Sequence, residues 1–200
     1  MIPFDPPPEP PTFRQQARRP GLEWLRRNPN AKRPKDFWSP FKPVLADGFR
    51  SLCAYSAMYE PVGTVDHYIS CRNCRDTNAA RAYSWGNYRF ASQWINSSKQ
   101  NADSAVVDPF KVQDGWFEIL LPSLQLVPGC LLPSRQRAKA NYTIERFHLR
   151  DDESILRQRR EWYRMHKNRE LNLEGLRKKA PLIAKAVEKW FASHPGAPLP

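Results

Sequence analysis

The pattern of apolar and polar positions predicts two short strands joined by a loop. The first strand covers residues 64–69 and carries Asp66 and His67 side by side. The second opens at Asn87 and leads into a helix that begins near Asn96. Because side chains alternate across a strand, Asp66 and His67 are expected to point to opposite sides, so that one holds a cation while the other faces a water molecule.

Apolar residues spaced three and four apart predict helices on both sides of this segment. A short helix is expected at residues 21–27, a second within 42–52 and a third at 134–149. Acids at 151–153 mark the start of the next helix, Asn172 caps another, and Pro181 suits the first turn of the last. Asp114-Gly115 is a turn signal that predicts a hairpin between residues 106–112 and 116–121. The expected fold class is α+β.

Proline dominates the start of the chain, since residues 1–43 hold 11 of its 20 prolines. Such a segment is extended, but it also contains large apolar residues, among them Phe13, Trp24 and Phe37, that do not suit a solvated tail. We therefore expect residues 1–43 to form a strap packed on the domain. Residues 44–127 are expected to form a core with an accessory hairpin, and residues 128–200 a basic helical region.

The chain is strongly basic, with a net charge of +12 and a pI of about 9.8, which favours nucleic acid over membrane as a partner. Residues 134–190 hold 16 Lys and Arg against 8 Asp and Glu. Three interpretations of that run remain open: solvated helix faces, a phosphate-binding surface, or a docking surface for a partner protein. There is no apolar run of about 18 residues and no apolar segment behind a basic start, so the expected location is cytoplasmic.

The residues of the two strands suggest chemistry at one site. A histidine has a near-neutral pKa and is the usual general base, and the oxygens of Asp66 and Asn96 suit Mg²⁺ or Mn²⁺. The alternative is that His67 is hydrogen-bonded in the core and that Asn87 and Asn96 are turn and cap residues.

The loop between the strands contains Cys71 and Cys74, which could be half of a zinc site, a redox pair or without any role. Arginines surround them, and we expect these to contact phosphates: Arg72, Arg75 and Arg81.

Three segments together resemble the ββα-metal motif of HNH endonucleases: Val65-Asp66-His67, Trp85-x-Asn87 and Asn96-x-x-Lys99. Cys53-Ala-Tyr-Ser56 and Asp108-Pro-Phe110 extend the resemblance to a bacterial group, some members of which partner defence ATPases. The resemblance covers roughly residues 53–110. Many HNH relatives hold a structural zinc ion at positions that match Cys53, Ser56, Ser92 and Ile95. Only one cysteine remains there, so no structural zinc is expected.

The resemblance implies a ββα-metal core and metal-dependent hydrolysis of phosphodiester bonds in DNA, with RNA as the alternative substrate, in a bacterial defence or DNA-processing role. His67 would be the general base, and Asp66 and Asn96 would bind one divalent ion. Asn87 would orient His67 and its loop, Lys99 would neutralise the scissile phosphate, and Arg89 would add a phosphate contact. The rival hypothesis is a non-catalytic subunit that binds nucleic acid or a protein partner on a decayed HNH fold.

Overall fold

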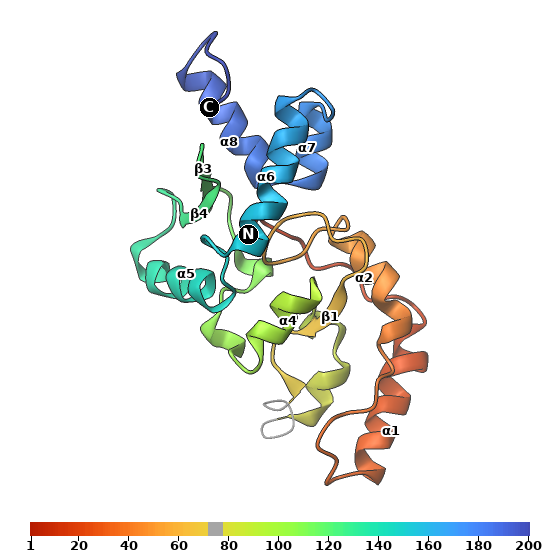
Figure 1. Ribbon diagram of the computed structural model, residues 1–200. Helices are drawn as coiled ribbons and strands as arrows, with labels where there is room; N and C mark the ends of the chain where they lie inside the picture. Colours follow the sequence, from red (N-terminus) through yellow and green to blue (C-terminus); the bar gives the residue numbers. More distant parts are fainter. Residues whose placement is uncertain (72–77) are drawn as a thin grey trace. The chain divides into compact units, whose positions relative to one another are not determined.

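The computed structural model describes residues 1–71 and 78–200, so the predicted roles of Arg72, Cys74 and Arg75 lie outside the described residues. The described chain combines helices with two small antiparallel sheets, which confirms the predicted α+β class (Figure 1). It divides into two compact units. The N-terminal unit comprises Phe4–Cys53 and Glu60–Ser104, and the C-terminal unit comprises Met1–Pro3, Ala54–Tyr59 and Ala105–Pro200.

The strap is helical in its central part. A π-helical segment, η1 (Arg14–Arg18), runs directly into α1 (Arg19–Arg27), so the helix begins earlier than the predicted residue 21. A short 3-10 turn, η2 (Ser39–Phe41), then leads into α2 (Lys42–Gly48). Pro40 stands in the first turn of η2, where a missing N–H costs no hydrogen bond, and Pro20 and Pro43 stand where one helical segment passes into the next.

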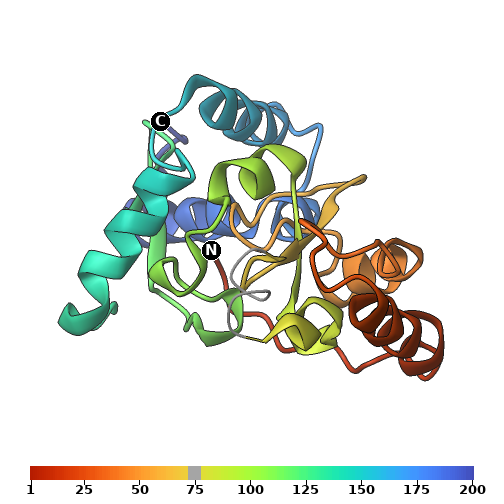
Figure 2. The same cartoon turned by 90° about the horizontal axis from the view of Figure 1, so that it is seen from below.

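Aromatic contacts attach the strap to the rest of the N-terminal unit. The ring of Phe13 is fully buried and packs edge-on against the rings of Phe41 and Trp85, with centroid distances of 5.0 Å and 5.2 Å. The indole nitrogen of Trp85 donates a hydrogen bond to the carbonyl of Pro7 at 2.8 Å. Figure 2 shows α1 in red beside the yellow-green segment 79–87, which it contacts. The strap is therefore part of the folded unit and not a solvated arm.

The predicted strands are present as β1 (Thr64–His67) and β2 (Tyr88–Ala91), which pair antiparallel with His67 opposite Tyr88. Two 3-10 turns precede β2: η3 (Ala79–Tyr83) and η4 (Trp85–Asn87). The helix α4 (Gln93–Lys99) follows β2, and α4 and α2 flank β1 in Figure 1.

The expected helix start near Asn96 is wrong by three residues. The N-cap position is Ser92, whose backbone is extended, with φ −62° and ψ 146°. The helical conformation therefore begins at Gln93, directly after β2, and Asn96 lies inside α4.

The accessory hairpin of the C-terminal unit is not the one that Asp114-Gly115 predicts. It consists of β3 (Phe117–Leu120) and β4 (Gln125–Pro128). Gly115 does adopt φ +75° in a turn, but this turn leads into β3 instead of reversing the chain. The segment before it contains the 3-10 turn η6 (Pro109–Lys111), because the Asp108 side chain accepts a hydrogen bond from the N–H of Phe110 and Pro109 has no N–H for a ladder.

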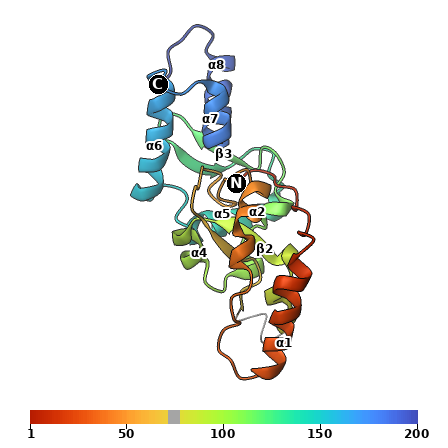
Figure 3. The same ribbon diagram turned by 90° about the vertical axis from the view of Figure 1, so that its right-hand side faces the viewer.

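The helices after the hairpin agree closely with the prediction: α5 (Ser134–Arg146), α6 (Glu153–Lys167), α7 (Leu173–Lys179) and α8 (Pro181–Ser193). Asp152 caps α6 by accepting from the N–H of Ser154, and Asn172 caps α7 by accepting from the N–H of Gly175. In Figure 3, α6, α7 and α8 pack together. Within the described chain, every helix falls short of the length and apolar character that a membrane crossing requires.

Candidate active site

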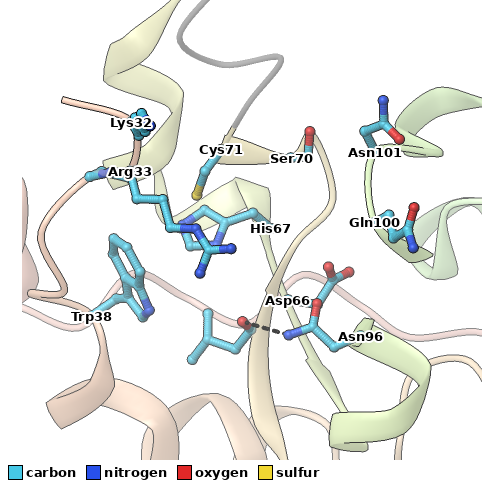
Figure 4. A pocket seen from close by; sticks show the side chains of 12 residues that line it. Lys32, Arg33, Trp38, Asp66, His67, Ser70, Cys71, Asn96, Gln100 and Asn101 are labelled. Atoms are coloured by element: carbon cyan, nitrogen blue, oxygen red, sulfur yellow. Dashed lines mark hydrogen bonds between the residues drawn. The ribbon is translucent and has the colours of Figure 1, made fainter. Parts of the chain in front are cut away.

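Asp66 and His67 line one pocket of about 740 Å³, together with Asn96. Asp66 nevertheless turns toward Lys99 and His67 toward Ala82, so the two neighbours leave the strand in different directions. The strand β1 ends at His67, beyond which the chain bends and the N–H of Tyr68 bonds to the carbonyl of Asn87 at 2.8 Å. The pocket therefore surrounds the end of the strand and includes both side chains (Figure 4).

The imidazole of His67 is held in one orientation. Its Nε2 lies 2.9 Å from the carbonyl oxygen of Ala82, and because a carbonyl can only accept, Nε2 carries the proton. The rings of Trp38 and Tyr88 pack edge-on against it at 4.5 Å and 4.9 Å. Burial lowers the pKa of His67 below its ordinary value, which the hydrogen bond to Ala82 and the charge of Asp66 offset only in part. His67 is therefore neutral at physiological pH, with a basic lone pair on Nδ1.

Asp66 is paired with Lys99. The ammonium of Lys99 lies 2.9 Å from Oδ1 of Asp66 and 2.5 Å from the carbonyl oxygen of His67, and the two side chains are 1% and 2% exposed, Lys99 being the more buried. Lys99 is the last residue of α4, and its side chain thus links this helix to β1. The expectation that Lys99 neutralises a scissile phosphate directly does not fit this position, because the ammonium is buried with the carboxylate and does not line the pocket.

Asn96 directs its amide oxygen toward Asp66. Its Nδ2 lies 3.4 Å from the carbonyl oxygen of Val65, a long hydrogen bond that turns Oδ1 to the other side of the amide group. Figure 4 shows the side chains of Asn96 and Asp66 on the same side of the pocket. No residue that the structure describes donates a hydrogen bond to Oδ1 of Asn96. A carboxylate and an amide oxygen that line one pocket are hard oxygen donors of the kind that bind divalent cations.

Asn87 organises the loops behind His67. Its Oδ1 accepts a hydrogen bond from the N–H of Ile69 at 2.8 Å. Its Nδ2 donates to the carbonyl of Ile69 at 3.0 Å and to that of Arg81 at 3.2 Å. Arg81 precedes Ala82, whose carbonyl bonds to the imidazole, so Asn87 is connected to His67 through the backbone of residues 81–82.

The two predicted phosphate contacts that the structure describes differ in exposure. Arg81 is exposed on η3. Arg89 is only 3% exposed, and its guanidinium donates to the carbonyls of Gly86 and Tyr88 at 2.9 Å and 2.8 Å and lies over the ring of Tyr68. This position argues against a phosphate contact by Arg89.

Sequence reasoning missed one wall of the pocket. Lys32, Arg33, Pro34 and Trp38 of the strap lie against the pocket that contains His67 (Figure 4). These residues precede the first predicted strand by about thirty positions. No local pattern connects them to it, and the only signal was the high aromatic content of the strap.

The donor set fits a divalent ion that has few protein ligands. Within residues 1–71 and 78–200, no three His, Cys, Asp or Glu side chains converge in a way that would hold a metal. Asp66 and Asn96 instead offer two hard oxygen ligands, as is usual for Mg²⁺, which keeps several waters and binds one or two carboxylates together with substrate phosphates.

Comparison with protein-family models, with curated proteins and with solved structures finds no match to this chain. The arguments about its function therefore rest on the geometry of the pocket.

Proposed function

We propose that this chain is a metal-dependent endonuclease that hydrolyses phosphodiester bonds in DNA, on a core similar to that of HNH endonucleases. One observation carries the proposal. The imidazole of His67 bonds through Nε2 to the carbonyl of Ala82, which leaves Nδ1 as the basic atom, in the pocket that Asp66 and Asn96 also line. A neutral, oriented imidazole beside hard oxygen donors is the arrangement that water activation on a phosphodiester requires.

Two further features support the resemblance to HNH endonucleases. The order of β1, β2 and α4 along the chain is that of a ββα unit. In addition, the Sγ of Cys53 lies 3.4 Å from the backbone nitrogen of Ser92, so two positions that carry zinc ligands in many HNH relatives are neighbours here without two cysteines.

In the proposed mechanism His67 takes a proton at Nδ1 from a water molecule that attacks the phosphorus atom, and the bond from phosphorus to the leaving oxygen breaks. The carbonyl of Ala82 stabilises the imidazolium that forms, because it already accepts from Nε2. Asn87 keeps that loop in place through its bond to the carbonyl of Arg81. Asp66 and Asn96 would hold one divalent ion, which would supply positive charge to a phosphoryl oxygen and the leaving oxygen.

The test is nicking of supercoiled plasmid by the full chain with Mg²⁺, with Mn²⁺ and with EDTA. We expect nicking only with a divalent ion, and its loss in His67→Ala. His194→Ala is the matched control, because His194 is exposed and stacks on Trp190. Equal nicking by wild type and His67→Ala, in preparations free of contaminating nuclease, would remove His67 from the mechanism.

The ion pair of Asp66 favours a second candidate function. Because Lys99 already compensates the carboxylate, the fold does not need a metal ion for charge balance, as expected of a non-catalytic nucleic-acid-binding subunit. DNA binding that is independent of divalent ions, without nicking under any of these conditions, would favour this candidate.

A further inference from the structure

The strap brings two cations to the pocket. The segment 28–38, here called the strap loop, contains Lys32 and Arg33, which line the pocket that contains His67. Figure 4 shows the guanidinium of Arg33 directed into the pocket. Both side chains are exposed, and neither forms an ion pair with any residue in the described part of the chain. Their charge is therefore available to a ligand.

The strap loop is anchored on both sides of these cations. Before them, the side chain of Asn28 donates to the carbonyl of Trp24 at 2.8 Å. After them, the carbonyl of Lys35 accepts a hydrogen bond from the hydroxyl of Tyr83 at 2.8 Å. Asp36 caps the next turn by accepting from the N–H of Trp38 at 3.0 Å. An anchored loop loses less conformational entropy when it binds a ligand.

The charge balance of the pocket favours an anion. Among the described residues that line it, Asp66 is the acidic one, and Lys99 compensates that carboxylate. The charges of Lys32 and Arg33 remain, on the side of the pocket formed by the strap loop. A guanidinium with an ammonium beside it is a frequent combination for backbone phosphates, with the guanidinium able to bind two oxygens at once.

We propose that Lys32 and Arg33 form the substrate-binding arm of this pocket and bind backbone phosphates next to the scissile one. The inference rests on the proposed function, because a nucleic-acid strand must enter the pocket. It goes beyond the predicted phosphate contacts, which all lie after residue 71. The arm gives affinity without base recognition, because it contacts only the backbone.

The experiment separates this arm from catalysis. Fluorescence anisotropy with a labelled single-stranded oligonucleotide and its duplex is measured in EDTA on the His67→Ala background, so that no cleavage occurs. The affinity is followed between about 50 and 200 mM salt. For Lys32→Ala/Arg33→Ala, two lost phosphate contacts make the slope of log affinity against log salt shallower by about 1.8 with duplex, or about 1.4 with single strand.

The matched control is Arg18→Ala/Arg19→Ala. This variant also removes two positive charges from the strap, but at exposed positions that do not line the pocket. The slope of its log affinity against log salt should therefore equal that of the parent. Circular dichroism melting checks that each variant folds.

Each outcome decides the inference. A shallower slope for the pocket variant alone supports the arm, and the strand state that the parent protein binds more tightly at equal salt is the preferred substrate. Equal slopes for the pocket and control variants overturn it, as does a parent protein that does not bind DNA. Nicking by the wild type is measured separately, so a protein that shows the slope change but never cuts overturns the proposed catalysis and leaves the arm in place.

Discussion

Among the described residues, the most deeply buried cation of each unit has different surroundings. Lys99 in the N-terminal unit and Arg159 in the C-terminal unit are both 1% exposed. The ammonium of Lys99 meets the carboxylate of Asp66. The guanidinium of Arg159 meets only backbone carbonyls among the described residues, those of Leu124 at 3.0 Å, Leu149 at 2.8 Å and Arg150 at 3.2 Å.

The difference teaches which buried charges indicate a functional site. Arg159 satisfies carbonyls just before β4 and just after α5, and it thereby joins three segments of the C-terminal unit. Burial lowers its pKa to about 10, so it stays charged at neutral pH, and it does not line the pocket that contains His67. Lys99 instead holds a carboxylate that lines a pocket. A buried cation therefore indicates a functional site only when the group that it neutralises lines a pocket.

The largest effect should come from His67→Ala, which tests whether the region of Lys99 is a catalytic site. Loss of a general base should slow divalent-dependent nicking by about 10²- to 10⁴-fold, while DNA affinity in EDTA stays near that of wild type. Rates are compared with those of Arg159→Met, below the melting temperatures of both variants. If Arg159→Met loses as much activity as His67→Ala, the contrast between the two regions is wrong.

Next in size is Lys99→Met, which leaves the Asp66 carboxylate buried without its cation. The free energy of unfolding should fall by about 3–5 kcal/mol, as measured by urea denaturation in EDTA. Mn²⁺ should then raise the melting temperature of this variant more than that of wild type, because the ion replaces the lost charge.

The control for Lys99→Met is the double variant Asp66→Asn/Lys99→Met. It removes both charges, so it should be more stable than the single variant and should not respond to Mn²⁺. An identical Mn²⁺ response in all three proteins would exclude Asp66 as a metal ligand.

A smaller loss is expected for Arg159→Met, which leaves backbone carbonyls without their donor. We expect the free energy of unfolding to fall by about 2 kcal/mol, with no recovery on addition of Mn²⁺. Arg157→Met, at an exposed position of the same helix, should change stability little. If a divalent ion restored the stability of Arg159→Met, the proposed difference between Lys99 and Arg159 would be wrong.

The smallest effect concerns Tyr83, which anchors the strap loop beside the pocket. Loss of its hydroxyl in Tyr83→Phe should cost about 1 kcal/mol of unfolding free energy at neutral pH. Burial raises the pKa of Tyr83 to about 12, so folding favours the neutral phenol. That contribution is complete below the ordinary pKa of 10 and is lost as the pH rises through about 12. The difference in unfolding free energy between wild type and Tyr83→Phe should therefore shrink as the pH rises from 10 to about 12. A difference that stays constant over this range would contradict the role of the Tyr83 hydroxyl.

Local signals predicted the parts of the fold that short-range interactions decide. Asp152 and Asn172 mark helix starts because each side chain accepts from an N–H of its own first turn, and Pro181 does so because its missing N–H would have no partner there. The turn at Asp114-Gly115 is also present, but its neighbours determine what it connects. Asp108 caps a 3-10 turn and Pro109 cannot join a ladder, so the hairpin forms one segment later, with its reversal at residues 121–124.

For the candidate site, the sequence by itself determined which side chains stand near the strand end: Asp66, His67, Asn87 and Asn96. It also determined that β1, β2 and α4 follow one another, because short-range patterns specify each element. Only the tertiary structure decided that Lys99 turns inward to Asp66, that Arg89 is buried, and that Lys32 and Arg33 reach the pocket. These outcomes depend on contacts between residues distant in the chain, where the free energy of burying a charge is set by partners that no local pattern identifies.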